Sequence, residues 1–350
     1  MTSEIIYSTV EEQVKKLKSQ NLTIADEDFA AATLKLYGYS NLIKSYREPY
    51  VIDNGETKMY RDGVSFEQIA SLYLFDKSLR NSVMSAMLDL EEHIKEISAD
   101  VISATFGVHP DQYLQFRNYR SLRTHIPRFT LKGLLDTMHK TLETDKDPIH
   151  HYATEHGIVP PWILFKSIYF GTIINFIKHF KPAEQTKVAR RLYGGDLGLS
   201  EQQLRYLMID TLFIANRYRN LAAHGGRTYN YDCSNKFRAK EIFGDKAPST
   251  KGFSLLLFLL SLLDYHRPFE ILKNSLDEEI NRHCLSFPSD VTYLTNVLHV
   301  NIESHSWVYV TRGSNKYHSN PHCSGIKNAN KIEYEEALSH GYTPCKKCAR

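Results

Sequence analysis

Four side chains near the end of the chain have the types and spacing of a metal site. His318, Cys323, Cys345 and Cys348 combine one imidazole with three thiols, and two residues separate Cys345 from Cys348. Thiolates and imidazoles are the ligands that zinc prefers, and four of them leave no open position for a substrate. The spacing therefore predicts one structural zinc ion per chain. His322 is an alternative to His318 as the fourth ligand, and ordinary reduced cysteines are the alternative to a metal site.

The segment around these ligands has the pattern of a small separate module. Trp307 to Thr311 is predicted to form a strand, Lys316 to His318 a return strand, and Glu333 to His340 a short helix. A module of about 45 residues has too small a core to fold easily without a metal or another staple. Residues 312–350 contain seven basic and three acidic side chains. Lys346 and Lys347 are therefore candidate contacts to RNA phosphates, and a solvated charged surface is the alternative.

A second polar group, Arg219, Asn220 and His224, lies at the end of a helix predicted over residues 200–224, just before Gly225 and Gly226. A histidine can move the proton of a ribose 2′-hydroxyl, and a guanidinium can stabilise charge on the phosphate. The trio therefore suits RNA cleavage that needs no metal. We expect Asn220, one turn before His224, to hydrogen-bond the imidazole. The alternative is that the arginine and the histidine only cap the negative end of the helix.

The spacing of Arg219 and His224 is by itself a weak signal, because the chain contains 16 histidines. A second pair with the same spacing, Arg120 and His125, lies in an irregular stretch with three other arginines. We expect this second pair to contact phosphate or to be coincidental rather than to catalyse a reaction.

The elements that must position these groups are mostly helical. Apolar residues recur at intervals of three and four from Ser65 to Phe106, which predicts one long amphipathic helix or two nearly collinear ones. Further helices are predicted over 8–20, 129–143, 162–180 and 252–282. The pattern weakens around Pro288, which indicates a linker. We therefore expect a mainly α chain with a helical domain over residues 1–285, a linker over 286–305 and the C-terminal module over 306–350.

Length and composition limit the classes of protein to which the chain can belong. Its 350 residues allow two or three domains, and 43 basic against 40 acidic side chains argue against a uniformly basic nucleic-acid-binding surface. Five cysteines are too few for a disulfide framework and suggest a reducing compartment. The N-terminus lacks the pattern of a secretory signal, and the longest apolar run, Phe253 to Leu263, is shorter than the roughly 20 residues that a membrane span needs. We expect a cytoplasmic protein with no membrane partner.

The chain also resembles a known family. Arg219, Asn220 and His224 resemble the signature of HEPN ribonucleases. Three further segments resemble the Abi-like family of bacterial abortive-infection proteins: Leu36 to Leu42 with Tyr46, Leu72 to Arg80 followed by Leu90 and Glu91, and Pro160 to Leu164 followed by Phe170 to Thr172. Their order and approximate spacing agree over residues 1 to about 285, which is most of the chain.

This resemblance implies a HEPN-type helical fold and a metal-independent endoribonuclease, a toxin that stops growth during phage infection. It implies an active site at a homodimer interface and inhibition by a protein antitoxin or a small non-coding RNA. By the resemblance Arg219 and His224 are catalytic and Asn220 supports them, with Arg217 and Arg227 as candidate RNA contacts. The alternative is a non-catalytic HEPN scaffold that binds RNA or a partner protein.

One position departs from the family pattern. Relatives tend to have arginine four residues after the glutamate of the long helix, where this chain has Lys95 after Glu91. Lysine keeps the charge but loses the two-pronged guanidinium, so the resemblance assigns no role to Lys95.

Overall fold

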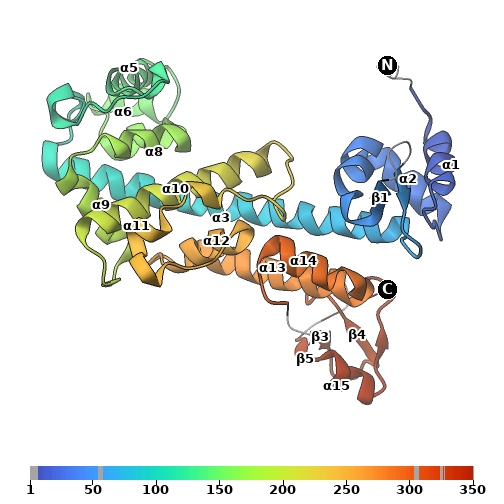
Figure 1. Cartoon of the computed structure of the whole chain (residues 1–350). Helices are drawn as coiled ribbons and strands as arrows, with labels where there is room; N and C mark the ends of the chain where they lie inside the picture. The colour runs from blue at the N-terminus through green and yellow to red at the C-terminus, as the bar shows by residue number, and fades with distance from the viewer. Residues whose placement is uncertain (1–6, 54–57, 303–306, 324–325, 327, 350) are drawn as a thin grey trace. The chain divides into compact units, whose positions relative to one another are not determined.

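The structure is a computed structural model that describes residues 7–53, 58–302, 307–323, 326 and 328–349 (Figure 1). The N-terminal residues 1–6, examined above for a secretory signal, and the basic residues Lys327 and Arg350 lie outside the described residues. The described chain is mainly helical with a small sheet near its end, which confirms the predicted fold class. Its contacts divide it into two compact units, residues 81–273 and residues 1–80 with 274–350.

Helix α3, Phe66–Phe106, is 41 residues long and contributes to both units. Its apolar side chains at helical spacing are completely buried, among them Leu79, Val83, Met87, Leu90 and Ile94. Burial of this stripe along the whole helix explains why it stays continuous over so many turns. The helix predicted over residues 65–106 is therefore confirmed.

The unit of residues 81–273 is organised around one central helix, α10, Glu201–Ala223. Leu207, Met208, Ile214 and Ala215 of α10 are completely buried. The helix packs against four others: α8 (Phe170–Lys178), α9 (Pro182–Tyr193), α11 (Ala239–Phe243) and α12 (Gly252–Ser261). The remaining helices of this unit are α4 (Pro110–Tyr113), α5 (Leu131–Leu142), α6 (Ile149–Glu155) and α7 (Pro161–Leu164).

Two helices that the sequence predicts as continuous are interrupted. The helix expected over 162–180 is divided into α7, a 3₁₀ turn at Phe165–Ser167, and α8, because Ile168 and Tyr169 have extended backbones. The helix expected over 252–282 is divided into α12 and α13, Arg267–Ser286. Pro268 favours a new helix start there, since proline has no backbone N–H and is tolerated only in a first turn.

The other unit joins the two ends of the chain. It contains α1 (Val10–Ser19), α2 (Glu27–Tyr37), a π-helix at Ser40–Lys44, the hairpin β1 (Val51–Asp53) and β2 (Lys58–Tyr60), and α14 (Val291–Leu298). Asp290 is 5% exposed, and its carboxylate accepts hydrogen bonds from Tyr50, Gln68 and His283 at 2.6, 2.8 and 2.9 Å. The segment 286–305, expected as a linker, thus contains a helix and a buried polar anchor.

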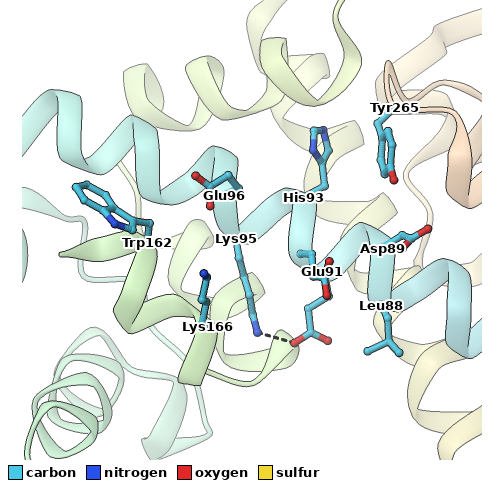
Figure 2. Close-up of a pocket in the computed structure, with 10 residues that line it drawn as sticks. Leu88, Asp89, Glu91, His93, Lys95, Glu96, Trp162, Lys166 and Tyr265 are labelled. Carbon is cyan, nitrogen blue, oxygen red and sulfur yellow. Dashed lines mark ion pairs between the residues drawn. The ribbon is translucent and has the colours of Figure 1, made fainter. Parts of the chain in front are cut away.

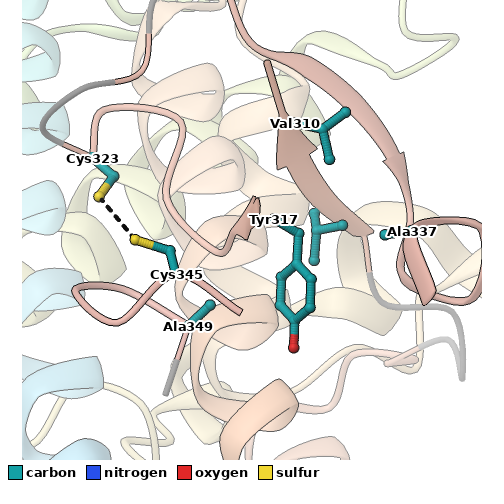
Figure 3. Close-up of a cluster of buried hydrophobic side chains, with 7 residues drawn as sticks. Val310, Tyr317, Cys323, Ala337, Cys345 and Ala349 are labelled. Atoms are coloured by element: carbon teal, nitrogen blue, oxygen red, sulfur yellow. Dashed lines mark hydrogen bonds between the residues drawn. The ribbon is translucent and has the colours of Figure 1, made fainter. Parts of the chain in front are cut away.

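The C-terminal module is a four-stranded sheet with one helix. The strand order is β5 (Asn330–Glu333), β3 (Trp307–Val310), β4 (Lys316–His318) and β6 (Thr343–Pro344), with helix α15 (Tyr334–Ser339) between β5 and β6 in the chain. The predicted pair of strands and the short helix are confirmed, while β5 and β6 were not predicted. Val308, Val310, Tyr317 and Ala337 form its small core (Figure 3).

The module is attached to helix α13 by a paired amide contact. The Asn281 side chain is 4% exposed; its oxygen accepts a hydrogen bond from the Trp307 backbone N–H at 3.1 Å, and its amide donates to the Trp307 carbonyl. Leu285 of the same helix packs against the module core. The module is therefore held by its first strand.

None of the helices in the described residues combines the length and apolar character that crossing a bilayer requires.

Candidate functional site

The C-terminal end of α10 positions the predicted catalytic residues. The helix starts with a capping box in which Ser200 accepts a hydrogen bond from the Gln203 backbone, and it ends at Ala223. The Gly225 N–H then bonds the Ala222 carbonyl at 3.1 Å and the Gly226 N–H bonds the Leu221 carbonyl at 2.9 Å. These are the two hydrogen bonds of a Schellman motif, and Gly225 supplies its left-handed residue with φ +71°. The helix therefore ends just before the two glycines, as the sequence predicts.

Arg219 is half-buried in the last turn of α10. Its Nη1 donates to Asn220 Oδ1 at 3.4 Å, while its Nε is buried without a hydrogen-bond partner among the described residues. A buried guanidinium donor that lacks an acceptor costs free energy. The Nε donor of Arg219 is therefore available to an acceptor other than the described residues, such as an anion.

His224 is the first residue beyond the helix and is exposed. Its backbone N–H bonds the Asn220 carbonyl at 3.1 Å, which fixes the chain but leaves the ring in solvent. We expected the Asn220 side chain to orient this imidazole. In the described chain the Asn220 side chain instead accepts from Arg219.

Arg217 and Arg227 lie on either side of the motif. The Arg217 guanidinium lies 5.8 Å from the centre of the Phe213 ring, and Lys178 Nζ lies 5.5 Å from the same ring. Burial raises the pKa of Tyr231, and a hydrogen bond with Arg217 opposes that rise. Arg227 is half-buried beside the fully buried Thr228. Arg217 is thus the exposed cation at this end of α10, and Arg227 lies where the chain returns to the core.

An ion pair that the sequence did not indicate attaches the middle of α10 to the chain that follows the glycine turn. Arg238 binds Asp210 of α10 through Nε at 3.1 and 3.2 Å and through Nη2 at 2.7 Å, and its backbone N–H donates to the same carboxylate at 2.9 Å. Tyr218 of α10 donates to the Tyr231 carbonyl at 2.7 Å. Both contacts attach the chain after the glycine turn to α10, and so hold the turn in place.

The second arginine–histidine pair has a structural explanation. The Arg120 Nε donates to the Phe180 carbonyl at 3.0 Å and its backbone N–H donates to the His179 carbonyl at 2.7 Å. These carbonyls follow the end of α8, so the guanidinium caps that helix. Arg120 therefore has structural partners within the chain, which fits a coincidental spacing, and its contact with phosphate stays a prediction.

A buried polar cluster connects two of the segments that carry the family resemblance. Tyr46 donates to Asp76 Oδ2 at 2.5 Å, and Arg80 Nη1 donates to the Tyr46 hydroxyl at 2.9 Å and to Asp76 at 3.1 Å. Burial raises the pKa of Tyr46, and the charge of Asp76 adds to the rise. Asp76 and Arg80 are four residues apart on one helix, a spacing that could have suggested their pairing. Tyr46 could not be inferred in this way.

The four predicted metal ligands come together in the C-terminal module. The donor atoms of His318, Cys323, Cys345 and Cys348 all lie within 4.8 Å of one another. Cys323 Sγ is 4.0 Å from Cys345 Sγ (Figure 3). Cys348 Sγ is 3.5 Å from His318 Nδ1. The cluster can therefore hold a metal ion, and no disulfide is formed among the described cysteines.

The alternative ligand His322 is exposed and does not join the cluster, whereas His318 on β4 is 8% exposed. A side chain directed from the strand can meet Cys323 across the turn. The structure thus favours His318 over His322.

The surroundings of Cys345 favour the thiolate that a metal requires. Its sulfur accepts a hydrogen bond from the Lys347 N–H at 3.5 Å. Burial raises the pKa of Cys345, but the backbone N–H groups of Lys347 and Cys348 and the neighbouring thiols outweigh it, so the pKa lies below its ordinary value. Lys346 and Lys347, the predicted RNA contacts, are exposed on this turn.

Comparison with known proteins places the helical part of the chain in a family. The model of the family described as Abi-like protein matches residues 32–230, a range that includes the Tyr46–Asp76 cluster, helix α10 and its glycine turn but excludes the metal cluster. No curated protein and no solved structure matches the chain. Because the matched range covers more than half of the 350 residues, the chain belongs to the Abi-like protein family.

Proposed function

We propose that the chain is a metal-independent endoribonuclease of the HEPN type that acts in abortive-infection defence against phage. Membership of the Abi-like family suggests the biological role. The observation that carries the chemical proposal is at the end of α10, where a buried Arg219 Nε, which has no hydrogen-bond partner in the part of the chain that the structure describes, lies five residues before an exposed His224. A guanidinium with a donor to spare and a solvent-accessible imidazole are the two groups that phosphodiester cleavage by an internal nucleophile requires.

In this mechanism the RNA supplies its own nucleophile, the ribose 2′-hydroxyl. His224 accepts the hydroxyl proton or returns a proton to the leaving 5′-oxygen, and Arg219 binds the phosphate and stabilises its developing charge. Asn220 accepts from Arg219 and therefore orients the guanidinium. Attack of the 2′-oxygen on phosphorus leaves a 2′,3′-cyclic phosphate and a free 5′-hydroxyl. No metal takes part in these steps.

A homodimer completes the site in this proposal. Cleavage needs a general base and a general acid, and each chain carries one such arginine–histidine motif at the end of α10. Two copies that meet at this end supply two histidines. Arg217, Arg227, Lys346 and Lys347 contact the RNA backbone, and a protein antitoxin or a small non-coding RNA restrains the activity. With free cysteines throughout the described chain, the site of action that we propose is the cytoplasm.

The metal ion of the C-terminal module is proposed to be a structural zinc. Tetrahedral zinc with Zn–S bonds of about 2.3 Å and Zn–N bonds of about 2.0 Å places two sulfurs about 3.8 Å apart and a sulfur about 3.5 Å from a nitrogen. The separations in the module are 4.0 Å for Cys323–Cys345 and 3.5 Å for Cys348–His318, which fits this geometry. Three thiolates and one imidazole fill the coordination shell, so the ion would stabilise the fold rather than catalyse.

The proposal is tested by incubating the purified protein with single-stranded RNA in magnesium-free buffer with EDTA, with zinc content measured in parallel. Wild type should yield 2′,3′-cyclic phosphate ends, and His224→Ala should lose cleavage while it keeps its circular dichroism spectrum and its mass in solution. His125→Ala, from the other arginine–histidine pair, should cleave normally. The alternative, a non-catalytic scaffold, is favoured if wild type and His224→Ala bind RNA equally and neither cleaves it.

A further inference from the structure

A pocket of about 660 Å³ in the unit of residues 81–273 has the wrong charge for a phosphate backbone (Figure 2). It lies between the middle of α3, the segment around α7 and the turn after α12. Its charged lining residues are Asp89, Glu91, Glu92, Lys95, Glu96 and Lys166. Four carboxylates thus oppose two lysines, and Lys95 already pairs with Glu91 at 2.7 Å. Because this lining repels anions, cations that could bind RNA must be sought elsewhere in the unit.

A polar seam between α8 and α10 contains such cations. Along each helix, residues that are half-buried or exposed recur at intervals of three and four, which places each set on one face. The set on α8 is Gly171, Asn175 and Lys178, and the set on α10 is Phe213, Asn216, Arg217 and Asn220. The neighbouring apolar positions of both helices are buried. We call these two sets together the α8–α10 seam.

The two faces of the seam touch at both ends of α8. A β-carbon placed on Gly171 would lie 3.5 Å from Asn216 Nδ2, so the start of α8 approaches α10 closely. At the other end of α8, Lys178 Nζ lies 5.5 Å from the centre of the Phe213 ring. The last residue of α8 is therefore held beside α10.

Two cations of the seam share one aromatic ring. Arg217 lies 5.8 Å from the centre of the Phe213 ring that Lys178 also faces. In the part of the chain that the structure describes, neither cation has a carboxylate at ion-pair distance, and Lys178 donates only to the Asn175 amide oxygen, at 3.4 Å. Burial lowers the pKa of Lys178; the charge of Asp210 opposes this effect and that of Arg238 adds to it. A bound anion would offset the cost of holding these charges together.

The seam continues to the candidate active site. Asn220 follows Arg217 by three residues on the same face of α10, and its Oδ1 accepts a hydrogen bond from Arg219 Nη1 at 3.4 Å. The helix rises about 10 Å from Phe213 to Asn220. An anion beside Phe213 is therefore separate from one that Arg219 binds.

We propose that Lys178 and Arg217 bind a second phosphate of the RNA, next to the phosphate that is cleaved, so that the strand lies along the α8–α10 seam. This inference rests on the proposed function, because it extends the strand from the cleavage site at Arg219. Cations flanked by amides suit a nucleotide strand, since amides can hydrogen-bond to riboses and bases while the cations neutralise phosphates. The substrate that fills the seam then has at least two phosphates.

The contact is tested by RNA binding in full-length protein with His224→Ala, which should keep the strand uncut. Fluorescence anisotropy of an end-labelled single-stranded oligoribonucleotide measures its affinity at several salt concentrations. Adding Lys178→Met should weaken binding about tenfold. It should also reduce the slope of log affinity against log salt by about 0.7, the value for one lost phosphate contact on a single strand. Lys178→Arg should preserve the slope, and Lys166→Met, which removes an exposed lysine outside the seam, should change neither quantity.

The number of phosphates is tested by competition with short unlabelled RNA. In the His224→Ala protein a trinucleotide with two phosphates should compete more strongly than a dinucleotide with one, and in the Lys178→Met background this advantage should disappear. The comparison of the two lengths needs no change at Lys178, so it remains valid if that variant misfolds. In the cleaving protein, Lys178→Met should raise KM and leave kcat nearly unchanged, because the contact is present before and during the reaction.

Four results would overturn the assignment: unchanged affinity and salt slope in Lys178→Met, an equal loss in Lys166→Met, equal competition by the two lengths, or stronger competition by polyglutamate than by RNA. The last would indicate an acidic protein partner instead. The two proposals fail separately. A wild type that cleaves while Lys178→Met binds RNA normally contradicts only the second phosphate site, whereas a wild type that never cleaves, with RNA binding that depends on Lys178, contradicts only the ribonuclease.

Discussion

Arg238 binds Asp210 through its guanidinium and its backbone N–H, across 28 residues of sequence. Asp210 is 6% exposed on α10, and the Arg238 side chain also lies over the Tyr206 ring at 4.0 Å. Because Arg238 follows the glycine turn, this pair fastens the returning chain to the helix that carries Arg219 and His224. The geometry of the candidate active site thus depends on a contact well away from it.

Arg238→Ala should lower the free energy of unfolding by about 2 kcal/mol, because it leaves the buried Asp210 carboxylate with the backbone N–H but without the guanidinium. The value is below that of a fully buried pair, since a third of the Arg238 side chain is in solvent. Arg190→Ala removes an exposed pair with Glu201 at the other end of α10 and should cost less than about 0.5 kcal/mol. Urea denaturation of both variants checks the difference, and equal losses would contradict it.

Gly225→Ala should destabilise the chain by about 1 kcal/mol, because alanine is strained at a left-handed φ of +71° even though the added carbon meets no atom within 4 Å. Gly225→Asn should cost less, since asparagine tolerates this conformation. Gly195→Ala, where the added carbon also meets nothing and φ is not left-handed, should be close to neutral. The midpoints of thermal unfolding should follow this order, and a neutral Gly225→Ala would show that the Schellman turn does not constrain His224.

The metal prediction distinguishes between neighbouring histidines. Purified protein should contain one zinc per chain by mass spectrometry of the metal. The double variant Cys345→Ser/Cys348→Ser should lose it, and His318→Ala should weaken it, because each removes donors from the four-ligand cluster.

Two variants serve as matched controls for that experiment. His322→Ala removes an exposed imidazole that directly precedes the ligand Cys323 but lies outside the cluster, and Cys233→Ser removes a buried thiol outside the module. Both should retain full zinc content. Loss of zinc in His322→Ala together with its retention in His318→Ala would reverse the ligand assignment.

The sequence predicted those parts of the structure that local patterns encode. Three such patterns each lie within a short stretch of chain. The apolar spacing predicts the long helix α3, the paired glycines predict the end of α10, and the spacing of cysteine and histidine predicts the metal cluster of the module. Helix α9 was missed because its buried face includes Glu184, Gln185 and Thr186, which interrupt the apolar period. Strand β5 was not predicted because Ile332 is its only apolar residue, so its sequence has no strand pattern. Its backbone pairing with β3 is what identifies it as a strand.

Contacts between distant residues could not be predicted from spacing. Tyr46 meets Asp76, and Arg238 meets Asp210, only once the helices have packed. The pocket around Glu91 is likewise formed by three segments of the chain, from α3, α7 and the turn after α12. A single sequence indicates which side chains are able to do chemistry, but the packing decides which of them share a site.

The last prediction concerns pH. Burial raises the pKa of Glu279 on α13 to about 7, although its ion pair with Arg282 and a hydrogen bond from Ser78 oppose the rise. In the unfolded chain the carboxyl group titrates near its ordinary value of 4.5. Between these two values the folded state keeps a proton that the unfolded state has released. The contribution of Glu279 to stability is therefore present below pH 4.5 and is lost as the pH rises toward and through 7.

A raised pKa of this size corresponds to about 3 kcal/mol across that window. Glu279→Gln keeps the shape but cannot ionise, so it should remove this slope from the pH dependence of the free energy of unfolding. The stability of the variant relative to wild type should therefore be higher at pH 8 than at pH 5. Glu270→Gln, on an exposed position of the same helix, should retain the wild-type slope. Urea denaturation at intervals between pH 4 and pH 8 measures both variants. If Glu279→Gln has the same pH dependence as wild type, then Arg282 holds the carboxylate charged in the folded state, and burial does not dominate at this position.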